Sequence, residues 1–154
     1  MPSHKHNKCI LKAKSRFVDR VSEKGRSIGK NEEPILNLLL SNHRIFSAYD
    51  IADTISKIGK RVQPTQIYRS LEKLMDMGVV HRLFSRNGFI ACYEDGDCSS
   101  GQFLICTECD SVEEIENKLI DNEIEKSAQE NNFSIINKSV EVLGQCNSCQ
   151  KILN

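Results

Sequence analysis

The sequence predicts an α+β protein built from two domains, and three observations lead to this fold class. Basic and acidic residues are divided between the two halves of the chain. A helix that begins at a proline is followed directly by the pattern of a β-hairpin. Two Cys-x-x-Cys pairs, at 106–109 and 146–149, lie in the last third of the chain. We expect domains at residues 1–93 and 103–154, joined by a hinge at residues 94–102.

The net charge of the 154-residue chain is zero because two opposite charges cancel. Residues 1–91 carry 17 Lys or Arg and 8 Asp or Glu, whereas residues 92–154 carry 4 and 13. This division favours a nucleic-acid-binding half over the simpler alternative of ordinary solvated surface. No apolar run reaches membrane-spanning length, and the N-terminus lacks a signal-peptide core. We therefore expect a cytoplasmic protein with no membrane partner.

The basic half begins with polar sequence. Residues 1–8 are expected to form a loose tail, and residues 9–24 a first helix. His4, His6 and Cys9 offer a possible metal site in this region. A stray thiol is the favoured interpretation of Cys9.

The next three helices include a predicted helix-turn-helix, which is formed by the third and the fourth. The second has Pro34 in its first turn, and Ser47 caps the third. The fourth begins at Pro64 and runs to about Met77, where Gly78 ends it. Its apolar stripe lies opposite a polar face that surrounds an arginine, as expected of a recognition helix in the major groove of DNA. The candidate DNA contacts are Lys60, Arg61, Thr65, Gln66, Tyr68, Arg69, Lys73 and Arg86.

A β-hairpin is expected from Val79 to Tyr93, directly after the recognition helix. Asn87-Gly88 is a strong signal for a two-residue turn. A hairpin in this position makes the first domain a winged helix-turn-helix, with the hairpin as its wing.

The predicted turn also suggests a metal site. It places His81 opposite Glu94 and Leu83 opposite Cys92, so His81 and Cys92 become diagonal neighbours on one face. The common alternative is a histidine and a cysteine that are merely buried. Further ligands would have to come from beyond the wing, and the donor types available there suit zinc better than manganese or magnesium. The candidate set is His81, Cys92, Cys98 and Glu114.

The second domain is expected to be a small α/β domain that forms dimers. Short strands at Phe103–Cys106 and Val112–Ile115 precede an amphipathic helix at Asn117–Glu130 and a long strand at Phe133–Leu143. A domain of this size has little core, so a bound metal would add needed stability. An exposed edge strand would invite pairing with a second copy of the chain.

The two cysteine pairs predict one structural zinc ion. Two intervening residues let a single turn direct both sulfurs at one point, and four thiolates suit tetrahedral zinc. Two disulfides are disfavoured because the chain has seven cysteines and is expected in a reducing compartment. A redox pair would normally lie at a helix N-terminus, whereas strand residues precede the first pair. The predicted ligands are Cys106, Cys109, Cys146 and Cys149.

These motifs occur in an order that resembles the ferric uptake regulator family of bacterial metal-dependent repressors. The matching features are Ile67-Tyr68-Arg69, Gly78–His81, Phe103–Cys109, the strand from residue 133, and Cys146–Cys149. The resemblance covers roughly residues 32–149, and the combination is specific although Tyr-Arg alone is not.

The resemblance also indicates a branch of the family. Iron- and peroxide-sensing members carry a His-rich stretch before the first cysteine pair, where this chain has Ser99–Gln102. The remaining pattern is most similar to the zinc uptake regulator branch, which implies a regulatory zinc on His81, Cys92, Cys98 and Glu114. Three departures are Cys98 where the family usually has histidine, Gln66 where it often has threonine, and Gly29–Glu32 in place of the usual Thr-Pro-Gln-Arg.

The resemblance implies a homodimeric, zinc-responsive transcriptional repressor with two zinc ions per chain, one structural and one regulatory. It would bind a palindromic double-stranded DNA operator when zinc is replete and control zinc-uptake genes. It would be no enzyme and would take no small organic substrate. The alternatives are a regulator of the same family that senses iron or another metal, and a thiol-redox protein that uses the cysteine pairs.

Overall fold

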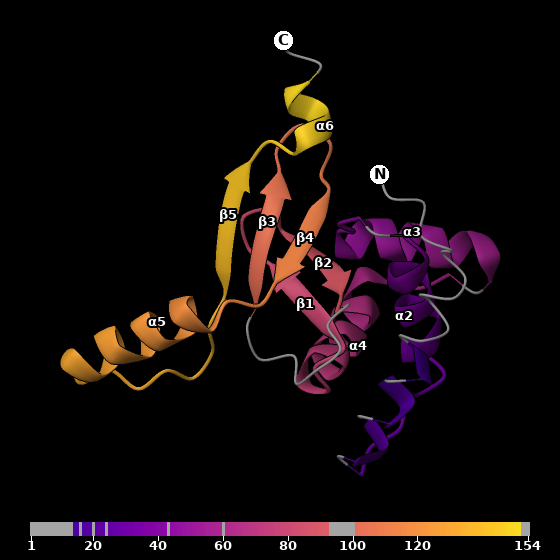
Figure 1. Ribbon diagram of the computed structural model, residues 1–154. Coiled ribbons are helices and arrows are strands. Elements are labelled where there is room, and N and C mark those ends of the chain that lie inside the picture. Colours follow the sequence, from indigo (N-terminus) through magenta and orange to yellow (C-terminus); the bar gives the residue numbers. More distant parts are fainter. Residues whose placement is uncertain are drawn as a thin grey trace. The chain divides into compact units, whose positions relative to one another are not determined.

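The computed structural model describes residues 14–15, 17–19, 21–23, 25–42, 44–59, 61–92 and 101–151 (Figure 1). The chain divides into two compact units, Met1–Asp97 and Cys98–Asn154, each with its own helices and sheet. The predicted α+β class is confirmed. The predicted tail at residues 1–8 and nearly all of the predicted hinge lie outside the described residues, as do Lys60 and Cys98.

The first unit is a group of helices followed by a hairpin. The described residues between 14 and 23 are helical and bury Phe17 and Val21. Helices α2 (Glu32–Ser41), α3 (Ala48–Ile58) and α4 (Pro64–Asp76) follow. Apolar side chains from all of these elements meet in one core, which includes Ile35, Leu36, Leu39, Leu40, Ile51, Ile67, Leu71 and Leu74.

Local sequence signals fix the start of α3 and α4. The Ser47 hydroxyl accepts a hydrogen bond from the Asp50 amide, and the Asp50 carboxylate accepts one from the Ser47 amide, which makes a capping box. Pro64 occupies the first turn of α4, as predicted. Between the helices the Ser56 hydroxyl accepts a hydrogen bond from the Val62 amide at 3.0 Å, which holds the connection against the end of α3.

The wing consists of β1 (Val80–Leu83) and β2 (Gly88–Ala91), and its register differs from the prediction. Val80 pairs with Ala91 and Leu83 with Gly88, so the chain reverses through residues 84–87 and not through Asn87-Gly88. Cys92 accordingly lies opposite Val79, whose carbonyl accepts its amide hydrogen bond at 3.0 Å, and not opposite Leu83.

Close packing beneath the wing explains the shift in register. Phe46 and Phe89 exchange two backbone hydrogen bonds of 3.1 and 2.8 Å, which adds residue 46 to the edge of the hairpin. A Cβ atom at Gly88 would overlap the Ile45 side chain and would lie 3.2 Å from the Phe46 carbonyl oxygen. Gly88 is therefore needed inside the strand for close approach, while Asn87 adopts the positive φ of the turn.

The second unit contains a three-stranded sheet with the order β4-β3-β5. Strand β3 (Gln102–Cys106) pairs antiparallel with β4 (Val112–Ile115) and parallel with β5 (Val140–Gly144). Helix α5 (Lys118–Glu130) precedes β5, and the short helix α6 (Asn147–Gln150) follows it. Buried Gln102 donates to Asp121 at the start of α5, and the Lys138 ammonium pairs with the same carboxylate, which lowers the pKa of Asp121.

The predicted strand at Phe133–Leu143 is wrong over its first half, because regular pairing begins only at Val140. A strand needs a neighbour to satisfy its backbone groups, and β3 starts pairing at Gln102, opposite Val140. The β-forming residues before Val140 stay outside the sheet, and Ile136 is 99% exposed. Helix α5 likewise buries none of its residues within this chain.

None of the helices in the described ranges is both long and apolar enough to span a membrane.

Candidate metal centre and nucleic-acid interface

Four cysteine sulfurs converge at one end of the sheet in the second unit. Cys106 ends β3, Cys109 lies in the turn before β4, and Cys146 and Cys149 belong to the start and body of α6. All four sulfurs lie within 4.8 Å of one another. The Thr107 amide donates to the Gly144 carbonyl at 2.9 Å, which fastens the first turn to the end of β5. Segments about forty residues apart in the sequence are thereby held together.

The sulfur spacing fits a tetrahedral metal and does not fit a disulfide. The sulfurs of Cys109 and Cys146 are 3.8 Å apart. Thiolates bound at 2.3 Å to a tetrahedral zinc ion lie about 3.8 Å from each other, whereas a disulfide is about 2.05 Å long. All four cysteines are free. The donor set and its geometry can therefore hold zinc.

The electrostatics of the cluster also favour a cation. The Cys146 amide donates to the Cys106 sulfur at 3.3 Å, and this is the main reason why the pKa of Cys106 falls to about 6. The pKa of Cys149 is raised to about 12, because its thiol bonds to the sulfurs of Cys146 and Cys109. Four neighbouring thiolates repel one another, so a dication at their centre is what allows all four to ionise together.

A second pair of donors lies on the wing. A ring nitrogen of His81, on β1, and the sulfur of Cys92, just after β2, are within 4.8 Å of each other. His81 pairs with Ile90, two residues from Cys92, so the two side chains are diagonal neighbours. The diagonal relationship was predicted correctly although the register was not. The residue opposite each of them moves by four positions, which is an even number, so the two side chains stay on the same face.

Two other predicted ligands belong elsewhere in the chain. Glu114 is a half-buried residue of β4, in the second unit. Cys98 lies outside the described residues. Their membership of one site with His81 and Cys92 stays a prediction.

The exposed face of α4 carries the predicted DNA contacts. Thr65, Gln66, Arg69 and Lys73 are exposed, whereas Tyr68 is half-buried and packs its ring edgewise on Phe89 of the wing at 6.2 Å. The Gln66 side-chain oxygen accepts from the Gln63 amide at 3.2 Å, so part of this side chain caps its own helix. The contact between Tyr68 and Phe89 fixes the recognition helix against the wing.

The wing has an aromatic and cationic surface. The Arg82 guanidinium lies 5.1 Å from the ring centroid of Phe84 and 5.9 Å from that of Phe89. Such cation–π contacts hold an arginine in place without removing its charge. Arg86 lies in the turn of the wing, as the revised register requires.

One residue of this face was missed by sequence reasoning. In the sequence Glu32 stands out only as part of the departure from the family pattern at Gly29–Glu32, but its side chain is buried, with the residue 5% exposed. Its carboxylate accepts a hydrogen bond from Ser70 and pairs with Lys73, both on α4. The departure from the family pattern at Gly29–Glu32 marked this segment as unusual. It did not indicate that Glu32 is buried or that its partners lie on α4.

Comparisons with known proteins agree with this architecture. Residues 23–143 match the model of the ferric uptake regulator family. The zinc uptake regulation protein of Escherichia coli (strain K12) is 25% identical over 119 residues, which are 77% of this chain and 70% of that protein. The crystal structure of holo XcZur has a TM-score of 0.80 at 28% identity and covers 92% of this chain and 99% of its own.

A zinc uptake regulator complexed with zinc and DNA has the same fold. Its TM-score is 0.85 at 20% sequence identity, covering 98% of this chain and 99% of that chain. Because the family match extends over most of the sequence, from the helices through the first cysteine pair to β5, the chain belongs to the ferric uptake regulator family.

Proposed function

We propose that this protein is a homodimeric, zinc-responsive transcriptional repressor that acts in the cytoplasm. It binds a palindromic DNA operator when zinc is replete and thereby controls genes for zinc uptake. In this proposal residues 1–93 bind DNA, residues 94–102 are the hinge, and residues 103–154 form the dimer. The observation that carries it is the His81 and Cys92 donor pair on the wing, whose Phe89 packs against Tyr68 of the recognition helix.

The proposal assigns two zinc ions to each chain. The structural zinc is held by the four cysteines of the second unit, whose 3.8 Å sulfur spacing suits it. The regulatory zinc is held by His81 and Cys92, with Glu114 and Cys98 as the further ligands. A set of sulfur, nitrogen and carboxylate donors favours zinc over manganese.

The regulatory ligands give a physical reason for zinc-dependent DNA binding. His81 and Cys92 belong to the wing, whereas Glu114 belongs to the second unit. A metal shared by these residues would restrict the separation of the two reading heads in a dimer to that of the operator half-sites. Zinc binding and DNA binding would then strengthen each other by the same factor.

The recognition face supplies the DNA contacts in this proposal. Arg69, which is exposed on α4, reads a guanine edge, and the half-buried Tyr68 beside it reads a base edge or thymine methyl group. Phosphate contacts fix the register of the protein on the duplex and carry no sequence information themselves. The proposed polar and phosphate contacts are Lys60, Arg61, Thr65, Gln66, Lys73 and Arg86.

Zinc content tests the proposal. The purified protein is expected to hold two zinc ions per chain and to keep one after mild chelation, because the four-cysteine site is tighter. Cys92→Ser is expected to hold one zinc ion, and that one resists chelation. Atomic absorption, with protein measured by amino-acid analysis, provides the stoichiometry.

The matched control is Cys9→Ser, which removes a cysteine outside both proposed sites. It is expected to keep two zinc ions per chain. A single resistant zinc in the unmodified protein, even in excess zinc, would contradict the regulatory site. Loss of the exchangeable zinc in Cys9→Ser would place that site on the N-terminal residues.

A further inference from the structure

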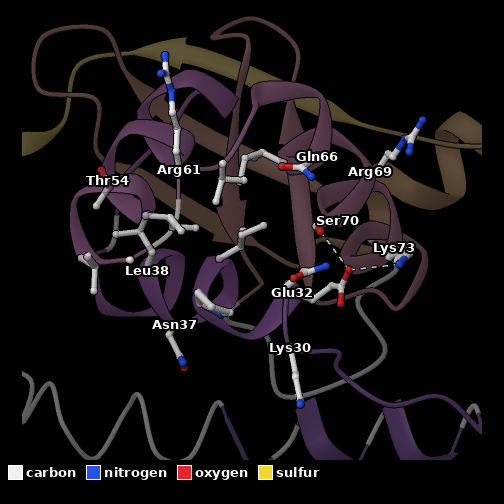
Figure 2. Close-up of a pocket in the computed structure, with 18 of the residues that line it drawn as sticks. Lys30, Glu32, Asn37, Leu38, Thr54, Arg61, Gln66, Arg69, Ser70 and Lys73 are labelled. Carbon is white, nitrogen blue, oxygen red and sulfur yellow. Dashed lines mark hydrogen bonds and ion pairs between the residues drawn. The ribbon is translucent and has the colours of Figure 1, made fainter.

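Helices α2, α3 and α4 surround a groove of about 920 Å³ (Figure 2). Its apolar part comes from the buried Ile35 and Ile67 and from the half-buried Leu38, among others. Its polar part contains many of the proposed DNA contacts. The charged and amide side chains that line it are Lys30, Asn31, Glu32, Asn37, Arg61, Gln66, Arg69 and Lys73.

Among the described residues that line the groove, Glu32 is the one acidic side chain, whereas the other charged residues are all cationic. Figure 2 shows Ser70 and Lys73 reaching from α4 toward its carboxylate. The Ser70 hydroxyl donates to Oε1 at 3.0 Å, and the Lys73 ammonium lies 3.4 Å from the same oxygen. Burial of an ionised carboxylate is costly unless it is paired, so these partners are required by the position of Glu32.

The backbone before α2 leaves space for this carboxylate. A Cβ atom at Gly29 would overlap Oε2 of Glu32, so no side chain fits at residue 29 while Glu32 keeps its position. The Gly29 carbonyl accepts the Glu32 and Glu33 amides at 3.1 and 3.0 Å. The segment therefore directs Glu32 inward, whereas the neighbouring Glu33 is exposed.

We propose that Glu32 is a positioning residue that competes with DNA phosphate for the Lys73 ammonium and so limits the affinity of the recognition face for DNA. While Lys73 pairs with Glu32, part of its positive charge is already neutralised before a phosphate approaches. A phosphate that takes Lys73 leaves the buried Glu32 carboxylate with Ser70 alone, and the same carboxylate repels the phosphate. This proposal rests on the proposed DNA-binding function of α4.

The expected signature is electrostatic and independent of sequence. Each phosphate neutralised on B-DNA contributes about 0.9 to the slope of log affinity against log salt. Release of Lys73 should therefore steepen this slope by about 0.9 per chain. Between 50 and 200 mM salt, one such contact changes affinity by about threefold.

The test uses the full-length, zinc-loaded protein and a duplex of random sequence, with affinity measured by fluorescence anisotropy across a salt series. Glu32→Gln keeps an oxygen that can accept from Ser70 but no longer holds Lys73 by charge. It should bind more tightly than the unmodified protein and with the steeper slope. Glu33→Gln, which removes the same charge from the next residue, should have a much smaller effect.

Two further variants isolate the role of Lys73. In the Lys73→Met background, Glu32→Gln should no longer steepen the slope, because the released cation is absent. Gly29→Ala keeps the net charge but displaces the Glu32 carboxylate, so it should steepen the slope in the same direction. It also provides a test if Glu32→Gln fails to fold.

The outcomes separate this proposal from the proposed function. If the unmodified protein binds DNA but Glu32→Gln matches Glu33→Gln, the role of Glu32 is wrong and the DNA-binding function stands. The role of Glu32 is also wrong if Glu32→Gln steepens the salt slope in the Lys73→Met background as much as it does in the unmodified protein. If the zinc-loaded protein binds no duplex at all, the proposed function fails and this inference fails with it.

Discussion

Cys106→Ser is expected to remove one zinc ion per chain and to unfold the second unit. Cys106 is 4% exposed at the end of β3, and its sulfur accepts the Cys146 amide that begins α6. Serine provides no thiolate for zinc, so the two cysteine turns lose their common centre. Structural zinc sites in zinc-finger peptides contribute about 10–16 kcal/mol of apparent binding free energy, far more than a small domain can lose.

Ser111→Ala is the matched control for this change. Its hydroxyl accepts from the Cys109 thiol at 3.3 Å but belongs to no proposed ligand set. The control should keep its zinc and its circular dichroism spectrum, whereas Cys106→Ser should lose zinc together with the signal of α5. If Cys106→Ser retained both a full zinc content and the folded spectrum, the structural role of the cluster would be refuted.

Arg69→Ala is expected to weaken operator binding by about 10- to 100-fold, with a smaller effect on random DNA. A bidentate contact between arginine and guanine contributes about 1–3 kcal/mol of discrimination between bases. Arg69 is exposed on α4, and the buried side of that helix is fixed by Ile67 and Leu71, so the substitution should not disturb the fold. The operator is first selected from a random library by the zinc-loaded protein.

Lys126→Met provides the control for charge, since Lys126 lies on the exposed surface of α5 in the other unit. It should leave the preference for operator over random DNA unchanged. An equal loss of affinity for both duplexes in Arg69→Ala would mean that Arg69 contacts phosphate and does not read a base.

Short-range signals were sufficient to predict most helices and strands. The capping box of Ser47 and Asp50 and the proline at the start of α4 are local features, and the structure has both. The four-cysteine cluster was predictable because the spacing within each pair fixes a turn, and zinc chemistry needs four such donors.

Errors arose where a distant segment decides the local structure. Asn87-Gly88 has the composition of a two-residue turn, but Gly88 serves the close approach of Ile45 and Phe46, which are about forty residues earlier. The segment before Val140 has β-forming residues but pairs with no strand in the part of the chain that the structure describes. The periodicity of a segment shows neither the close approach of a distant segment, as at Gly88, nor the lack of a pairing strand, as before Val140.

Glu32 shows the same limitation within the candidate interface. Acidic residues in the first turn of a helix usually remain at the surface, as Glu33 does. The burial of Glu32 depends on Ser70 and Lys73, which enter from another helix. The wing donor pair was predictable because His81 and Cys92 lie close in one hairpin, so an error in the turn left their shared face intact.

The decisive measurement for zinc-responsive repression is the affinity for the selected operator at buffered concentrations of free zinc. In the unmodified protein, we expect this affinity to rise with free zinc by a factor of about 5 to 150, the usual range for coupled sites. Cys92→Ser should keep its structural zinc but bind with a low affinity that free zinc does not change. Equal operator affinity of the unmodified protein with and without exchangeable zinc would contradict a zinc-responsive repressor and leave a DNA-binding protein with another trigger.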